Sequence, residues 1–182
     1  GHPYWGYRFL GWGLHYVQDL TQPYHAKVMP GSTTPGLLWV SAKDQLGYPE
    51  GKEAVVKRVA DRHTAIESFQ LAWLSSLLAE GKTDNPMFEA YSDQSTDQRY
   101  PAFAANYLRD TVSAEAYANA DALDQQIGVW MAGNPGAAGF SESNKLVAAD
   151  SVDPQMQKVL VELITHFGAH TRNAVAATLP KR

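Results

Sequence analysis

Residues 12–25 read WGLHYVQDLTQPYH, and the expected organisation of the chain follows from this stretch. The segment 4–20 is apolar over most of its circumference and is predicted to be a helix that is central to the core. On such a helix, His15 and Asp19 lie one turn apart on the same face. An imidazole and a carboxylate are therefore expected to project side by side from one helix.

A proline sets the end of this helix. Pro23 has no amide donor and biases Gln22 away from helical angles. The helix is therefore predicted to stop near Leu20 or Thr21. A tight turn directly after it is expected to return His25 to the side of the same helix.

A second helix is predicted over residues 52–78, where apolar residues recur at helical spacing and Gly81 follows the end. His63 and Glu67 lie in its middle and share one face. With the first pair and His25 they make five ligand-type side chains without a cysteine. Such nitrogen and oxygen ligands suit zinc, with manganese and iron as poorer alternatives. The alternative for each pair alone is a hydrogen-bonded pair without a metal.

The order of these residues resembles the ligand signature of a known family. In this chain the signature is His15-x3-Asp19-x2-Gln22-Pro23-x-His25, followed by His63-x3-Glu67. It is similar to that of the zinc-dependent bacterial phospholipases C, whose superfamily includes the zinc-dependent single-strand nucleases. The resemblance covers residues 9–26 and 60–69 directly. It implies a single all-helical domain with a cluster of three zinc ions that hydrolyses phosphodiester bonds.

The resemblance also implies roles for individual residues. His15 and Asp19 would hold one zinc ion, and the Asp19 carboxylate would reach across to a neighbouring ion as the catalytic group. His25, His63 and Glu67 would hold the remaining ion. In the family, a stretch before this motif supplies further histidines, an amino-terminal tryptophan and an aspartate that contacts the attacking water. This chain is expected to be the carboxyl-terminal part of such a domain, with two or three zinc ions where the upstream ligands are present.

Composition limits the classes of function. The chain has 182 residues, of which 45% are apolar and 19% charged, as expected for one globular domain. A net charge of -4 without a basic run argues against a surface that grips duplex nucleic acid. No apolar stretch approaches the roughly 20 residues that a membrane-spanning helix needs, and no signal peptide is visible. A secreted or periplasmic location is implied by the family resemblance alone.

Proline and glycine punctuate residues 26–51, which are predicted to form a long loop. Its apolar segment 37–40 is expected either to cap the core or to contact lipid peripherally. Further helices are predicted over 100–110 and 113–132, with Ser113 as an amino-terminal cap. Residues 136–151 show no period and are expected to wrap the surface.

A last helix is predicted from Pro154 to about residue 179. It carries a competing group of potential ligands, Glu162, His166 and His170, each four residues apart. These three side chains span roughly 12 Å at about 1.5 Å per residue, too far to share one ion. The favoured interpretation is a polar face of exposed or hydrogen-bonded histidines, although one adjacent pair could bind a metal.

The function predicted from these residues is metal-assisted hydrolysis of a phosphodiester. Glu67, where the nucleases tend to have aspartate, and the segment 21–26 resemble the phospholipase branch more than the nuclease branch. The absence of cysteine favours the same branch. Cleavage of a phospholipid head group is therefore expected. The alternatives are a single-strand nuclease or nucleotidase of the same superfamily, and a catalytically silent helical domain that retains one structural metal.

Overall fold

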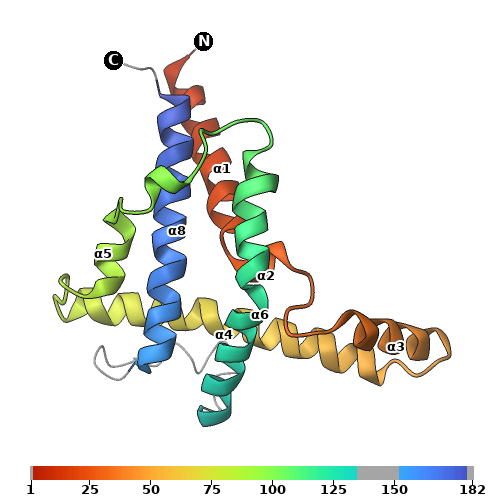
Figure 1. Ribbon diagram of the computed structural model, residues 1–182. Helices are drawn as coiled ribbons and strands as arrows, with labels where there is room; N and C mark the ends of the chain where they lie inside the picture. Colours follow the sequence, from red (N-terminus) through yellow and green to blue (C-terminus); the bar gives the residue numbers. More distant parts are fainter. Residues whose placement is uncertain (1, 135–151, 180–182) are drawn as a thin grey trace. The chain divides into compact units, whose positions relative to one another are not determined.

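The computed structural model describes residues 2–134 and 152–179, and every regular element in them is a helix (Figure 1). This confirms the all-α prediction. The elements are α1 (Pro3–Leu20), α2 (Pro23–Ala26), α3 (Thr34–Gln45), α4 (Glu50–Ala79), α5 (Pro86–Ser92), η1 (Asp97–Arg99), η2 (Leu108–Ser113), α6 (Ala114–Gly133) and α8 (Pro154–Thr178). The predicted surface segment 136–151 lies outside the described residues.

The chain divides into two compact units, each built from segments that are distant in sequence. The first unit comprises Gly1–Ala26, Asp84–Asn119 and Lys158–Arg182. The second unit comprises Lys27–Thr83 and Ala120–Gln157. The chain therefore passes from one unit to the other directly after α2, between α4 and α5, inside α6 and inside the first turn of α8. The expectation of a single domain stays a prediction.

In the first unit, α1 ends where the proline predicts. The helix stops at Leu20, and the Thr21 hydroxyl donates to the Gln18 carbonyl at 2.7 Å. Pro23 then begins the one-turn helix α2. At the first position of a helix the amide has no acceptor within the helix, so a proline there costs no hydrogen bond. On another face, the Gln18 side chain donates to Thr171 of α8 at 3.4 Å, which ties the end of α1 to α8.

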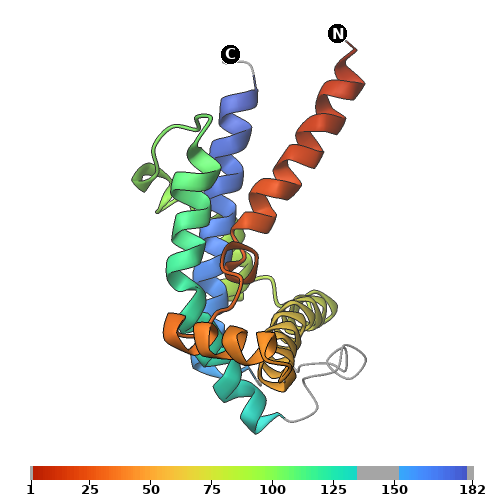
Figure 2. The same ribbon diagram turned by 90° about the vertical axis from the view of Figure 1, so that its right-hand side faces the viewer.

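The prediction that α1 is central to the core is wrong. Val17 is its one buried residue, while Trp5, Phe9 and Trp12 are 51%, 59% and 53% exposed. Figure 2 shows the amino-terminal half of α1 diverging from α8, and an apolar groove of about 680 Å³ lies along α1 there. The helix is apolar on two faces, and only its carboxyl-terminal end is packed. Apolar composition therefore overstated its burial.

The predicted helix 100–110 is also wrong. Residues 101–106 are irregular, and the chain then enters η2, a π-helical turn that contacts α1. Because η2 runs directly into α6, Ser113 already has helical neighbours on both sides and is no cap. The predicted helices at 113–132 and from Pro154 are confirmed as α6 and α8. Asp153 caps α8, because its carboxylate accepts from the Gln155 and Met156 amides at 3.0 Å.

In the second unit, the predicted helix at 52–78 is confirmed as α4, but its core face differs from the expected apolar stripe, because Leu71 and Leu78 are exposed. Ile66, Trp73 and Leu77 of this helix are fully buried. Phe69 meets Trp130 of α6 edge to face, with ring centroids 5.0 Å apart. Large apolar side chains of α4 and α6 thus hold the second unit together.

The predicted long loop 26–51 contains the helix α3, which packs on α4, and that prediction is corrected. Thr33 caps α3 by accepting from the Gly36 amide at 3.3 Å, and Pro35 lies in the first turn. Proline in the first helical turn costs no hydrogen bond, so the apparent loop signal marks a helix start.

The turn before α3 is anchored to α6. The Gly31 amide donates to Asp121 at 2.8 Å, and Lys27 pairs with the same carboxylate at 2.6 Å. The hydrogen bond from Lys27, followed by that from the Gly31 amide, lowers the pKa of Asp121. Gly31 has φ +69°, and a Cβ there would collide with the Asp124 carboxylate.

Gly31→Ala is therefore expected to lower the free energy of unfolding by about 3 kcal/mol, from backbone strain plus steric overlap. Gly47→Ala is the matched control, because Gly47 also has positive φ, at +87°, but its Cβ would enter open space. The control should cost about 1 kcal/mol. Urea unfolding followed by circular dichroism measures both, and equal losses would show that the contact with Asp124 is relieved without cost.

Candidate metal centre

The turn after α1 brings His25 back to Asp19. The Nδ1 atom of His25 lies 3.3 Å from Asp19 Oδ1 and 3.1 Å from the Asp19 carbonyl oxygen. This confirms the return predicted from Pro23. The turn itself is closed by the Gln22 amide, which donates to the Asp19 carbonyl at 3.0 Å. Five residues of backbone thus place an imidazole beside a carboxylate.

We call His15, Asp19 and His25 the first half-site; the structure brings His25 against Asp19, and the place of His15 beside them is a prediction from helical spacing. His15 is exposed on α1, one helical turn before Asp19 and on the same face. Its ring lies against Tyr16, with centroids 5.9 Å apart. The first half-site is therefore accessible at the surface of the first unit and presents two imidazoles and one carboxylate.

His63 and Glu67 form the second half-site, on α4 in the second unit. His63 Nε2 lies 3.0 Å from Glu67 Oε1, at the expected i,i+4 spacing. His63 is partly exposed and Glu67 is exposed, while the neighbouring Ala65 and Ile66 are buried. Next to His63, Arg62 reaches the buried Asp124 carboxylate of α6 and donates to the Asp124 carbonyl at 3.1 Å.

The donors of both half-sites fit a divalent zinc ion. Each half-site offers imidazole nitrogen and carboxylate oxygen, the ligands of zinc sites that have no cysteine. Without a metal, imidazole and carboxylate satisfy each other, as His25 does with Asp19 and His63 with Glu67. The half-sites belong to different units, and their convergence on one metal cluster stays a prediction.

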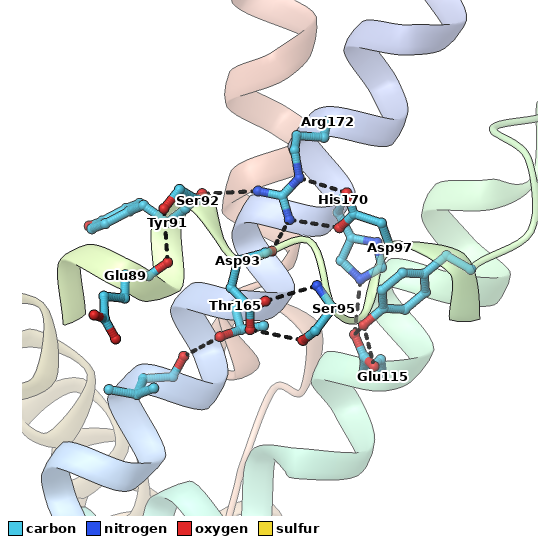
Figure 3. A network of polar contacts seen from close by, with 12 residues as sticks. Glu89, Tyr91, Ser92, Asp93, Ser95, Asp97, Glu115, Thr165, His170 and Arg172 are labelled. Carbon is cyan, nitrogen blue, oxygen red and sulfur yellow. Dashed lines mark hydrogen bonds and ion pairs between the residues drawn. The ribbon is translucent and has the colours of Figure 1, made fainter. Parts of the chain in front are cut away.

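The histidines of α8 belong to a separate polar cluster in the first unit, of which Figure 3 shows His170 and Glu115. We call it the Glu115 network. His170 is 1% exposed, and its Nε2 lies 2.9 Å from Glu115 Oε2 while its Nδ1 lies 2.8 Å from the Tyr107 hydroxyl. Tyr100 donates to the Glu115 carboxylate at 3.0 and 3.1 Å, and His166 lies 3.5 Å from it.

The interpretation of His170 as a hydrogen-bonded histidine is confirmed, and His166 contacts the same carboxylate. The carboxylate that they share is Glu115 of α6, whereas Glu162 is exposed on α8. Glu115 is 55 residues from His170, so no helical spacing could have indicated the pair. A carboxylate in the first turn of α6 was the one available signal, and it suggested only a favourable dipole contact.

Burial and hydrogen bonding compete within the Glu115 network. Burial acts to raise the pKa of Glu115, but the His170 hydrogen bond and the nearby His166 outweigh it, and the pKa is lowered overall. Burial, followed by the charge of Glu115, raises the pKa of the Tyr100 hydroxyl. Burial also raises the pKa of Tyr107. Both phenols therefore stay protonated, and Tyr100 donates its hydroxyl hydrogen to the Glu115 carboxylate.

Arg172, two residues after His170, holds the segment that follows α5 (Figure 3). Its guanidinium pairs with both oxygens of Asp97 at 2.7 and 2.8 Å and donates to the Tyr91 carbonyl at 2.9 Å and to the Asp93 carbonyl. The hydrogen bond to Asp97 raises the pKa of Arg172 further above its ordinary value. Such bidentate contacts fix both position and orientation, so this part of α8 has a structural role.

No protein-family model, no curated protein and no solved structure matches this chain. Function is therefore argued from the two half-sites themselves. Within residues 2–134 and 152–179, no helix has both the length and the apolar character that crossing a bilayer requires.

Proposed function

We propose that this protein is a zinc-dependent phosphodiester hydrolase of the phospholipase C type. The observation that carries the proposal is the turn at Pro23, which brings His25 back to Asp19. Asp19 itself lies one helical turn after His15 on α1. A hydrogen-bonded helix pair needs no third side chain, whereas a catalytic zinc site uses three protein ligands. The second half-site on α4 repeats the same chemistry at the same spacing.

Each side chain has a defined task in this proposal. His15, His25 and His63 donate neutral imidazole nitrogens, so proton uptake at low pH competes with metal binding. Asp19 and Glu67 offset the cationic charge, and Asp19 additionally orients His25 through the contact described above. Zinc, when bound, supplies Lewis acidity towards phosphoryl oxygens and lowers the pKa of water. No covalent intermediate with a side chain is required.

The proposed substrate is a phospholipid whose head group is released by cleavage of the phosphodiester. The sequence resemblance to the phospholipase branch, described above for Glu67 and residues 21–26, supports this choice. A net charge of -4 without a basic run supports it as well, because a zwitterionic phospholipid needs no cationic surface, whereas the backbone of a nucleic acid does.

The test combines zinc counting with two substrates. Purified chain dialysed against zinc is expected to bind more than one ion and to release phosphocholine from phosphatidylcholine in mixed micelles. Removal of zinc with a chelator should abolish the release, and re-addition should restore it. Nucleotide release from single-stranded DNA without action on the lipid would replace the proposal with the nuclease alternative. One zinc ion or none, with neither activity, would favour the silent helical domain.

A further inference from the structure

The helix α3 is apolar on two opposite sides. Leu37 and Val40 are half-buried and, with Met29 and Val55, line a small cavity of about 220 Å³ between α3 and α4. This inner side accounts for the packing of α3 in the second unit. The opposite side is also apolar, although α4 does not cover it.

We call this opposite side the outer face of α3. Its members recur at helical spacing and are all exposed: Pro35, Leu38, Trp39, Ala42 and Leu46. Leu38 is 67% exposed, Trp39 64% and Leu46 74%. Single exposed apolar residues are ordinary, but a complete apolar stripe along a helix indicates a surface that another apolar phase covers.

The charged residues of α3 indicate what kind of apolar partner covers the outer face. Lys43 and Asp44 are the two charged residues of α3. Asp44 is half-buried and pairs with Lys52 at 2.7 Å, so its charge is neutralised on the α4 side. Lys43 remains at the edge of the outer face with its ammonium group 5.2 Å from the centre of the Trp39 ring. The stripe is thus bordered by a cation and is complementary to anionic phosphate groups.

We propose that the outer face of α3 seats the protein on a phospholipid surface. Tryptophan prefers the boundary between acyl chains and head groups, leucine the acyl side, and lysine the phosphate level, and the outer face of α3 and its edge carry all three residue types. A helix of 12 residues is too short to span a bilayer and lies in its plane. The inference rests on the proposed function and deepens it: the substrate is an aggregated lipid surface instead of single dissolved molecules.

Flotation with vesicles tests this directly, using the full chain in the presence of a chelator so that binding is separated from hydrolysis. The vesicles are made of phosphatidylcholine with and without phosphatidylglycerol. The double variant Leu38→Ser, Trp39→Ser is expected to lose about tenfold or more in vesicle affinity, because two apolar side chains no longer enter the interface. Lys43→Glu should lose about fivefold or more, and only on vesicles that contain phosphatidylglycerol.

Leu78→Ser is the matched control, since Leu78 is 57% exposed on α4 and lies outside the outer face. Its vesicle affinity should equal that of the unaltered chain, and circular dichroism should show the same helix content in all variants. Equal affinity of the double variant and the unaltered chain would overturn the inference. A second result would also overturn it: the unaltered chain dimerises with increasing concentration, the double variant does not, and neither binds vesicles. A second copy of the chain would then be what covers the outer face.

A dissolved short phosphodiester, bis(p-nitrophenyl) phosphate, separates this inference from the proposed function. Zinc-loaded double variant should hydrolyse it at the unaltered rate while losing activity on vesicles. If the unaltered chain binds vesicles through the outer face but hydrolyses neither substrate, the proposed function is wrong and the inference of lipid binding by the outer face is confirmed. If it hydrolyses the dissolved substrate without binding vesicles, the inference of lipid binding is wrong and the proposed phosphodiester hydrolysis is confirmed.

Discussion

Glu115→Ala is expected to lower the free energy of unfolding by about 3 kcal/mol. The Glu115 carboxylate accepts hydrogen bonds from His170 and Tyr100, and His170 is almost fully buried. Truncation would leave the ring nitrogen of His170 and the Tyr100 hydroxyl without their acceptor. Buried donors that lose their partner carry the full cost of desolvation. Urea unfolding monitored by circular dichroism measures the loss.

Glu162→Ala is the control for this prediction. Glu162 was grouped with the same histidines by sequence spacing, but it is exposed on α8. Its replacement should change the free energy of unfolding by no more than about 0.5 kcal/mol. A larger loss for Glu162→Ala than for Glu115→Ala would show that the polar network is wrongly placed.

The stability conferred by Glu115 should also depend on pH. Because the folded state lowers the pKa of Glu115 below its ordinary value of 4.5, folding favours the ionised form. The contribution is therefore fully present above the unfolded pKa and is lost as pH falls through the folded pKa. The difference in unfolding free energy between the unaltered chain and Glu115→Ala should accordingly shrink below about pH 4.5. An unchanged difference at lower pH would exclude a role for the ionised carboxylate.

His25→Ala and His63→Ala are each expected to lower kcat/KM for a dissolved phosphodiester by about a hundredfold or more. Loss of a residue that only orients a metal ligand costs about 10–100-fold, so loss of a ligand itself should cost more. If the two half-sites serve one metal cluster, either loss disables the same centre. The double variant should then be hardly slower than either single variant, because residues that act as a unit are not additive. Initial rates with zinc in excess measure all three.

Asp61→Asn on α4 is the matched control, because Asp61 pairs with Lys57 at the same i,i+4 spacing but without an imidazole. It should leave both zinc content and rate unchanged. His63→Ala should also remove part of the rise in melting temperature that zinc produces in the unaltered chain. A double variant whose loss equals the product of the single losses would indicate two independent sites. Full zinc content in His63→Ala would remove this residue from the metal centre.

Local sequence predicted the parts of this protein that depend on close neighbours. The end of α1, the return of His25 to Asp19 and the pairing of His63 with Glu67 all arise within a few residues of backbone. Helical spacing and a proline are enough to specify them. The same local signals are misleading at α3, where proline and glycine predict a loop although Pro35 lies in the first turn of a helix.

Sequence by itself determined an all-helical chain, the contact of His25 with Asp19 and the pairing of His63 with Glu67. Only the tertiary structure decided which residues surround the histidines of α8, because Glu115 and Tyr107 reach His170 from 55 and 63 residues away. It also decided that the apolar side chains of α1 and of the outer face of α3 remain exposed. Burial depends on what packs against a helix, and a periodic pattern specifies the apolar face without specifying its partner.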